Sequence, residues 1–264
     1  MKLTPFITIT LAITVPLSVC SYLDNHGYVL TTQAVNMPGN TPDQPGKNLL
    51  TLPGDYKGEW KALFDGKTLN GWHTYGENYA GSAWKVDDGV IHMTPVKDEQ
   101  QQGDLVTNDE FENFDLKLEW KVETGSNSGI IFLVHEDTTL FKETYVTGLE
   151  MQVLDNIGAS DNKKENHLAG TLYDLLGSAA VSKPNPVGEW NKAEIICDKG
   201  QLKLLLNDKI TVSTTLWDDN WKNMVANSKF KKMPGFGTFK RGHIALQYHG
   251  HEVWYRNIEI KNLD

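Results

Sequence analysis

Side chains that can move protons lie on one face of a predicted strand at residues 148–155. Because successive side chains of a strand point to opposite faces, Glu150 and Gln152 share one face. Strict alternation sends Asp155 to the other face, and a single β-bulge after Gln152 would return it. The apolar neighbours of Glu150 indicate an interior strand. We therefore expect Glu150 to be a general base or a metal ligand, with Asp155 as a second ligand.

A second set of polar side chains follows a polar loop at residues 156–166. It consists of His167, Tyr173 and Asp174, whose imidazole, phenol and carboxylate can donate, accept and orient protons. His167 is the rival to Glu150 as the base, and Tyr173 and Asp174 are the candidate acid and orienting group. Since a loop histidine is more often structural, this set depends on where the fold places it.

A third set lies on a predicted strand at residues 242–249, where Ile244 and Leu246 face the core. Alternation places the polar side chains of this strand on the opposite face, so it lines a wet groove or is simply exposed. We adopt the groove. In it, Gln247 and His249, together with Gln152 of the first set, are the candidates for binding a substrate through their amide and imidazole groups.

Several function classes lack their motifs in this sequence. There is no glycine-rich phosphate-binding loop, no serine nucleophile elbow, and no Cys or His pair with zinc-ligand spacing. The net charge is −9 at pH 7, and no basic stripe appears, which argues against a nucleic-acid partner. Of the two cysteines, Cys197 lies in an apolar run and is expected to be a buried thiol without chemistry.

The elements that must position these residues are predicted to be strands. Residues 114–122 alternate apolar and charged side chains without a break, and Asp88-Gly89 is a hairpin-turn signal. A meander follows at residues 192–214, with turn signals at Lys199-Gly200 and Asn207-Asp208. One helix is indicated by the spacing of Trp217, Trp221, Met224 and Val225. Many short strands at even spacing predict an all-β sandwich or jelly roll of antiparallel sheets over residues 59–264.

The amino terminus has the pattern of an export signal. Met1-Lys2 is followed by an apolar stretch too short for a membrane span, and Leu17-Ser-Val-Cys20 resembles a lipobox. Lipidation at Cys20 would make the chain a periplasmic or outer-membrane lipoprotein with a membrane anchor; plain cleavage nearby is the alternative. Prolines, glycines and polar residues predict a flexible linker over residues 21–58.

From about Glu59 to Asp264 the chain resembles the bacterial 3-keto-disaccharide hydrolase family. The matching segments, in order, are LFDGKTLNGWH (63–73), SNSGIIF (126–132), EMQVLDN (150–156), HLAGTLYDL (167–175), PVGEWN (186–191), SKFKKMPGFG (228–237) and GHIALQYHG with VWYRNIEI (242–260). The resemblance implies a concanavalin A-like jelly roll with a carbohydrate groove, in which His135 is a further substrate-binding candidate. Tyr248 departs from the pattern, because family members often carry Asp there.

The resemblance also implies an activity on small 3-keto-glycosides. A ketone at carbon 3 makes the hydrogen on carbon 2 acidic, so a base can remove it, the carbon 1 substituent leaves, and water adds to the resulting glucal. The site needs a base, an acid, and a group that stabilises the enolate oxygen. A divalent ion held by Glu150, Asp155 and a histidine is one way to stabilise it. The pathway partner would be an upstream sugar 3-dehydrogenase.

Two other interpretations of the sequence remain open at this point. A retaining glycosidase needs two carboxyls about 5–5.5 Å apart, and Glu150 with Asp155 faintly echoes such a pair, although Gln152 replaces the acid expected between them. A carbohydrate-binding module without catalysis would bind sugar saturably and turn nothing over.

Overall fold

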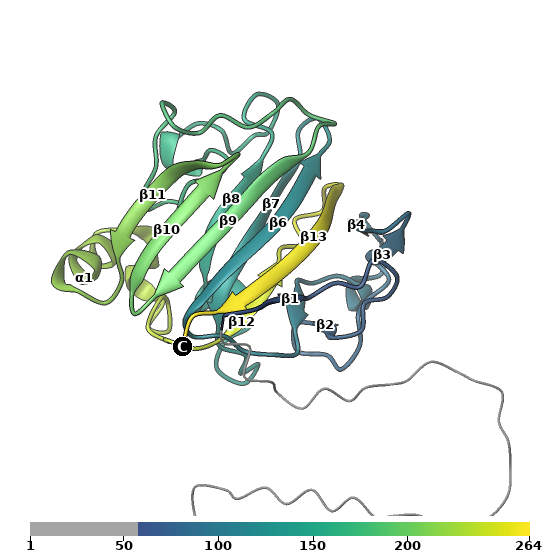
Figure 1. Cartoon of the computed structure of the whole chain (residues 1–264), viewed down its shortest axis with the longest axis horizontal. Coiled ribbons are helices and arrows are strands. Elements are labelled where there is room, and N and C mark those ends of the chain that lie inside the picture. The colour runs from purple at the N-terminus through teal and green to yellow at the C-terminus, as the bar shows by residue number, and fades with distance from the viewer. Residues whose placement is uncertain (1–57) are drawn as a thin grey trace, which may run out of the picture. The chain divides into compact units, whose positions relative to one another are not determined.

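The computed structural model describes residues 58–264, which form two antiparallel β-sheets (Figure 1). The larger, eight-stranded sheet has the order β11-β10-β9-β6-β13-β4-β3, with β1 paired to β13; the five-stranded sheet has the order β2-β5-β12-β7-β8. The strands of the larger sheet are β1 (Trp60–Ala62), β3 (Trp84–Asp87), β4 (Val90–Met93), β6 (Phe114–Val122), β9 (Asn191–Asp198), β10 (Gln201–Leu206), β11 (Lys209–Thr215) and β13 (Val253–Asn262). Those of the smaller sheet are β2 (Trp72–Thr74), β5 (Leu105–Thr107), β7 (Asn127–Val134), β8 (Leu149–Leu154) and β12 (His243–Leu246).

The core lies between the two sheets and follows from the alternation in the sequence. Every second residue of β6, from Phe114 to Val122, is buried, and the residues between them are half-buried on the outer face. Side chains of β7 and β8 join the same core, and Figure 1 shows these strands behind β6 and β9. The predicted fold class, a concanavalin A-like jelly-roll sandwich of two antiparallel sheets with one short helix, is confirmed.

The predicted tight turns of the larger sheet are also confirmed. Asp88-Gly89, Lys199-Gly200 and Asn207-Asp208 each have positive φ at both residues, and each joins two neighbouring antiparallel strands. Two consecutive left-handed residues give the turn that matches the twist of a β-hairpin. These short sequence signals therefore account for the pairing of β3 with β4 and for the meander of β9, β10 and β11.

One α-helix, α1 (Asp219–Ala226), packs with its buried Trp221 against the core. It begins later than the spacing of the tryptophans predicts, because Asp218 is the N-cap and accepts a hydrogen bond from the Trp221 amide at 2.7 Å. Trp217 lies before the helix with a φ of 66°. The 3₁₀ helices are η1 (Glu99–Gln101), η2 (Thr144–Val146), η3 (Glu165–His167) and η4 (Lys229–Lys232).

The outer face of the five-stranded sheet carries a row of five paired residues. Cross-strand pairing joins His73 to Val106, Val106 to Ala245, Ala245 to Ile131, and Ile131 to Glu150. The three middle residues form, with Val134, a small apolar cluster separate from the main core. The row therefore places two ionisable side chains at opposite edges of one sheet, with an apolar floor between them.

The predicted export segment 1–20, including Cys20, lies outside the described residues, as does the predicted linker up to residue 57. Within residues 58–264, no helix is both long enough and apolar enough to cross a membrane. Cys197 is buried in β9 as a free thiol, and burial raises its pKa to about 12.

Candidate active site

Glu150 lies on β8, which is the end strand of the five-stranded sheet and not the interior strand that the sequence predicts. Its free edge is covered by residues 170–173. Three hydrogen bonds between backbone groups make this cover. The Tyr173 N–H donates to the Glu150 C=O at 3.0 Å, the Gln152 N–H donates to the Thr171 C=O at 3.0 Å, and the Gly170 N–H donates to the Gln152 C=O at 2.8 Å. This pairing covers the edge of β8, and it brings the second polar set beside the first.

The Glu150 side chain lies on the outer face of the sheet and the residue is 9% exposed, while Leu149, Met151 and Val153 belong to the core. Burial raises the pKa of the Glu150 carboxyl to about 8, and the negative charge of Asp104 adds to this rise. A carboxyl with such a pKa exchanges protons near neutral pH, which is the property of a general base or acid.

Two neighbours leave room for the Glu150 carboxyl and orient it. Gly129 on β7 has no side chain where a Cβ would overlap Oε1 and Cγ of Glu150. With the Gln152 amide nitrogen facing its acceptors, Gln152 donates to Glu150 Oε1 at 2.9 Å and to the Ser128 carbonyl at 3.1 Å. Gln152 is 1% exposed, so it supports the carboxyl from within the protein.

His167 is held between two carboxylates. Its Nδ1 lies 2.8 Å from Asp161 Oδ1 and its Nε2 lies 2.7 Å from Asp174 Oδ1. Since a carboxylate only accepts hydrogen bonds, both contacts are satisfied together by a ring that carries both protons. The Tyr173 hydroxyl donates to Asp161 Oδ2 at 2.8 Å, and the Tyr173 ring lies 4.5 Å from that of His167. These four residues form one connected network.

The ionisation of this network is uneven. Although burial opposes ionisation, hydrogen bonds from His167 and Lys164 hold the pKa of Asp174 below its ordinary value. Burial and the hydrogen bond to Asp161 raise the pKa of the Tyr173 hydroxyl. Asp174 is therefore a fixed anion, and Tyr173 keeps its proton at neutral pH. Asp174 has a φ of 55°, a conformation that Asp adopts more readily than most residues.

Asp104, Asp161 and Lys229 are charged residues of this region that the sequence did not single out. Asp104 precedes β5, accepts hydrogen bonds from Thr144 Oγ1 and, at 2.7 Å, from the Tyr248 amide, and burial raises its pKa to about 6. The Lys229 ammonium lies 4.0 Å above the centre of the Tyr173 ring, and its charge opposes the rise in the Glu150 pKa. The sequence signals for these residues were weak. Asp161 lies in a polar loop, Lys229 in a lysine-rich segment, and Asp104 directly before a short strand.

Gln247 and His249 follow β12 toward the same region. The backbone N–H of Gln247 donates to the Gly129 C=O at 2.9 Å. This bond extends the pairing of β12 with β7 as far as Gly129, the glycine that contacts the Glu150 side chain. The His249 ring stacks on that of His251 at 5.5 Å. Burial and His251 lower the pKa of His249, while the charge of Asp161 acts in the opposite direction. Gln247 therefore lies beside Gly129, and His249 lies within reach of the charge of Asp161.

Asp155 is not brought to Glu150. β8 pairs with β7 in regular register, so the predicted β-bulge after Gln152 is wrong. The Asp155 carboxylate instead accepts hydrogen bonds from the Gly125 amide at 2.8 Å and from the Ile157 amide at 2.9 Å. Burial raises the pKa of Asp155, but these hydrogen bonds together outweigh it and lower the pKa below its ordinary value. Among residues 58–264, no group of three or more His, Cys, Asp and Glu side chains is placed to hold a metal ion, so the predicted pair does not form a cluster.

His135 lies in an aromatic group beyond the end of β7. Its ring stacks on Phe239 at 4.0 Å and meets Phe141 edge to face at 6.1 Å. In the described part of the chain, no contact links His135 to Glu150 or to the His167 network. Its role in substrate binding therefore stays a prediction.

A second polar cluster occupies the other end of the row that contains Glu150. His73 Nδ1 lies 2.7 Å from Asn108 Oδ1, and His73 Nε2 lies 2.8 Å from Glu136 Oε2. The hydrogen bond to Glu136 raises the pKa of His73. Glu136 Oε1 also accepts a hydrogen bond from the Gly76 backbone N–H at 2.6 Å. This cluster therefore connects the start of the 136–147 loop to β2 and the turn after it.

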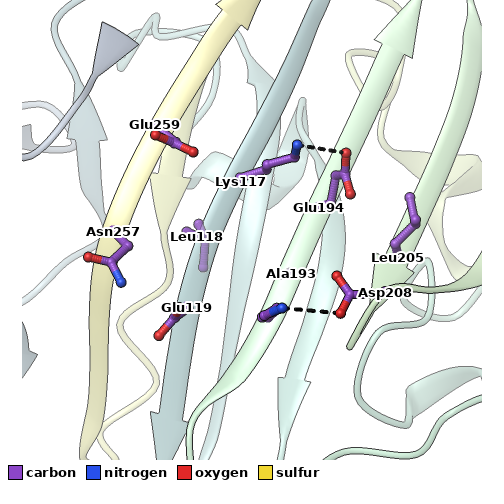
Figure 2. A pocket seen from close by; sticks show the side chains of 10 residues that line it. Lys117, Leu118, Glu119, Ala193, Glu194, Leu205, Asp208, Asn257 and Glu259 are labelled. Atoms are coloured by element: carbon purple, nitrogen blue, oxygen red, sulfur yellow. Dashed lines mark hydrogen bonds and ion pairs between the residues drawn. The ribbon is translucent and has the colours of Figure 1, made fainter. Parts of the chain in front are cut away.

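The outer face of the larger sheet has a depression of about 310 Å³ between β13, β6, β9 and β10 (Figure 2). Figure 2 shows Lys117 and Glu194 paired across it, and their charged groups are 3.5 Å apart. Lys192 pairs with Asp208 at 3.2 Å. The outer face of the five-stranded sheet, with Glu150 and the His167 network, is therefore the stronger candidate for catalysis.

Comparisons with known proteins show which family the chain resembles. A family model described as a 3-keto-alpha-glucoside-1,2-lyase-like domain matches residues 59–261. A relative from Bacteroides thetaiotaomicron, named 3-keto-disaccharide hydrolase, is 38% identical over 239 residues, which are 81% of this chain and 82% of the relative. A solved structure of a candidate glycosyl hydrolase from Parabacteroides distasonis is 28% identical with a TM-score of 0.71, covering 78% of this chain and 94% of that chain. A second structure from that species is 28% identical with a TM-score of 0.56, covering 78% and 100%.

Proposed function

The chain belongs to the 3-keto-alpha-glucoside-1,2-lyase-like family, and on this premise we propose that it cleaves 3-keto-glycosides, including 3-keto-disaccharides. The name of the 38% identical relative supports this substrate class. The observation that carries the proposal is a buried carboxyl, Glu150, whose pKa of about 8 suits proton abstraction near neutral pH.

In the proposed reaction, the Glu150 carboxylate takes the proton from carbon 2 of the sugar. The electrons of that C–H bond form a carbon 2–carbon 3 double bond, and the keto oxygen becomes an enolate. When the carbonyl re-forms, the bond from carbon 1 to the glycosidic oxygen breaks, the leaving oxygen takes a proton, and a glucal remains. Addition of water across the carbon 1–carbon 2 double bond completes the net hydrolysis.

The surrounding residues take supporting roles in this scheme. We assign the proton for the leaving oxygen to the Tyr173 hydroxyl, which stays protonated because burial and Asp161 raise its pKa. In this step the hydroxyl turns from Asp161 to the leaving oxygen. His167 is assigned to orienting rather than to the base, since both its ring nitrogens face carboxylates, one of them Asp174. Gln152 orients Glu150, and Gln247 and His249 are the candidates for sugar hydroxyls.

The decisive experiment follows the mature protein and a 3-keto-glucoside by NMR, with and without a chelator. The proposal predicts a transient glucal and then free 3-keto-glucose, and it predicts no cleavage of the unoxidised nitrophenyl glucoside. Cleavage of the unoxidised glycoside would support a retaining glycosidase instead. Saturable binding without turnover would support a binding module. The chelator arm tests whether a divalent cation takes part.

We also propose that the chain is exported, with a lipid anchor at Cys20, and that a sugar 3-dehydrogenase supplies its substrate. The support is the amino-terminal stretch with the pattern of an export signal and the lipobox-like sequence that ends at Cys20, together with the need for an oxidised carbon 3. Metabolic labelling with a fatty acid tests the anchor: Cys20→Ala should abolish the label, and a label that persists would rule out Cys20 as its site.

A further inference from the structure

Lys229 is an exposed lysine at the start of η4, yet its ammonium group lies over the Tyr173 ring. In the described part of the chain it makes no ion pair and no hydrogen bond, so its N–H donors are open to a bound ligand. Its charge acts on Glu150 and on Asp174. The charges of Asp104 and Asp161 act on Glu150 in the opposite sense.

The backbone around Lys229 is fixed on both sides. Ser228 is the N-cap of η4, and its hydroxyl accepts the Phe230 amide at 3.1 Å and donates to the Val225 carbonyl at 2.8 Å. The Phe230 ring is buried and stacks on Phe236 with 3.8 Å between ring centres. Because these contacts hold the backbone before and after Lys229, the base of its side chain has a defined position, from which the ammonium group reaches the Tyr173 ring.

Proton abstraction by Glu150 leaves negative charge on the oxygen at carbon 3, and this charge requires a cation or a hydrogen-bond donor. Of the four residues in the His167 network, two are carboxylates, and both ring nitrogens of His167 face them. Lys229 is a cation whose charge acts on Glu150, and its ammonium group lies over the ring of Tyr173. Resting on the proposed function, we propose that Lys229 is a catalytic residue that donates a hydrogen bond to the carbon 3 oxygen and stabilises the enolate.

The test separates enolisation from cleavage. A 3-keto sugar without a leaving group, 1,5-anhydro-3-keto-glucitol, reports proton abstraction alone through exchange of the carbon 2 hydrogen in D₂O, followed by NMR. Cleavage of a 3-keto-glucoside is measured in parallel between pH 5 and 10. The variants are Lys229→Met, Lys229→Arg and, as the matched control, Lys232→Met, which removes a lysine from the same turn.

Lys229→Met should slow both exchange and cleavage about 10²–10³-fold, the usual effect of removing one donor to a developing oxyanion. It should also move the acidic limb of the pH profile to higher pH, because the cation that lowers the Glu150 pKa is gone. Lys229→Arg should retain more of both rates than the Met variant, and Lys232→Met should behave as wild type.

Wild-type rates in Lys229→Met, or an equal loss in Lys232→Met, would overturn the assignment. Failure of the proposed function looks different: the folded wild-type protein would then neither exchange the carbon 2 hydrogen nor cleave the glucoside, and the role of Lys229 would fall with it.

Discussion

Gly129 on β7 lies against the side chain of Glu150 on β8, and the space that a Cβ would occupy at Gly129 is filled by the Glu150 carboxyl. The backbone at Gly129 also accepts the Gln247 amide, so the glycine cannot move away without breaking the sheet. The position of the proposed base thus depends on the absence of a side chain one strand away.

Gly129→Ala should therefore abolish most activity while the fold persists. The atoms in the way belong to a flexible side chain, so Glu150 can rotate aside, at the cost of its orientation. We expect the turnover rate of the enzyme on a keto-glucoside to fall at least about tenfold, since small misplacements of a reacting group are costly. Thermal unfolding checks the fold; an unchanged turnover rate would show that the carboxyl does not need this position.

Glu150→Gln should lower the turnover rate by about 10²–10⁴-fold and stabilise the protein at neutral pH. The pKa of Glu150 is about 8 in the fold against 4.5 for the ordinary group, so the native state holds one more proton between these values. Stability must then fall as pH rises from 4.5 to 8, by on the order of a few kcal/mol. Gln removes this slope. Denaturant unfolding of both proteins across this pH range measures the difference, and parallel curves would contradict it.

Asp104→Asn should shift the acidic limb of the kcat/KM profile to lower pH. The Asp104 carboxyl has a pKa of about 6, and its charge raises the pKa of Glu150. Asn removes the charge and keeps an oxygen for the Tyr248 amide. Asp115→Asn is the control, because Asp115 also has a pKa of about 6 but lies on the larger sheet. Equal shifts in both variants would show that the effect is not local to Glu150.

Glu136→Gln should lower the pKa of His73, read from the ring-proton shifts by NMR. The Glu136 hydrogen bond raises this pKa, so its stabilising effect is complete below about 6.5 and is lost as pH rises through the folded pKa. Burial raises the pKa of Glu136, but the hydrogen bonds from His73 and Gly76 and the charge of His73 together outweigh this and hold the pKa below 4.5. The stabilisation that Glu136 contributes is therefore lost as pH falls through its pKa in the folded protein. The pair therefore stabilises most between about 4.5 and 6.5. Glu110→Gln, next to His243, should leave His73 unchanged.

Most of the fold could be predicted because its signals are local. The alternation of β6 and the three two-residue turns each involve neighbours in sequence, and the structure confirms them. The place of β8 in its sheet could not be predicted in this way. Its apolar residues indicate burial, but they do not reveal that β8 ends its sheet and that residues 170–173 cover its edge.

The candidate site was predictable only in part for the same reason. Glu150 stood out because a charged residue on an apolar strand needs an explanation. Asp155 was misplaced, since loop amides that no alternation rule describes hold its carboxylate. Asp161 and Lys229 lie in polar segments where many side chains have the same chemistry, and only tertiary contacts select one of them.

The segment that closes the edge of β8 has a consequence beyond catalysis. An uncovered end strand offers its amides and carbonyls to other chains, which is a common route to aggregation. Residues 170–173 occupy those groups and also lead into Tyr173 and Asp174. Evolution of a new substrate preference through this loop is therefore constrained by solubility: loop variants that improve the chemistry but loosen the edge would be lost as insoluble protein.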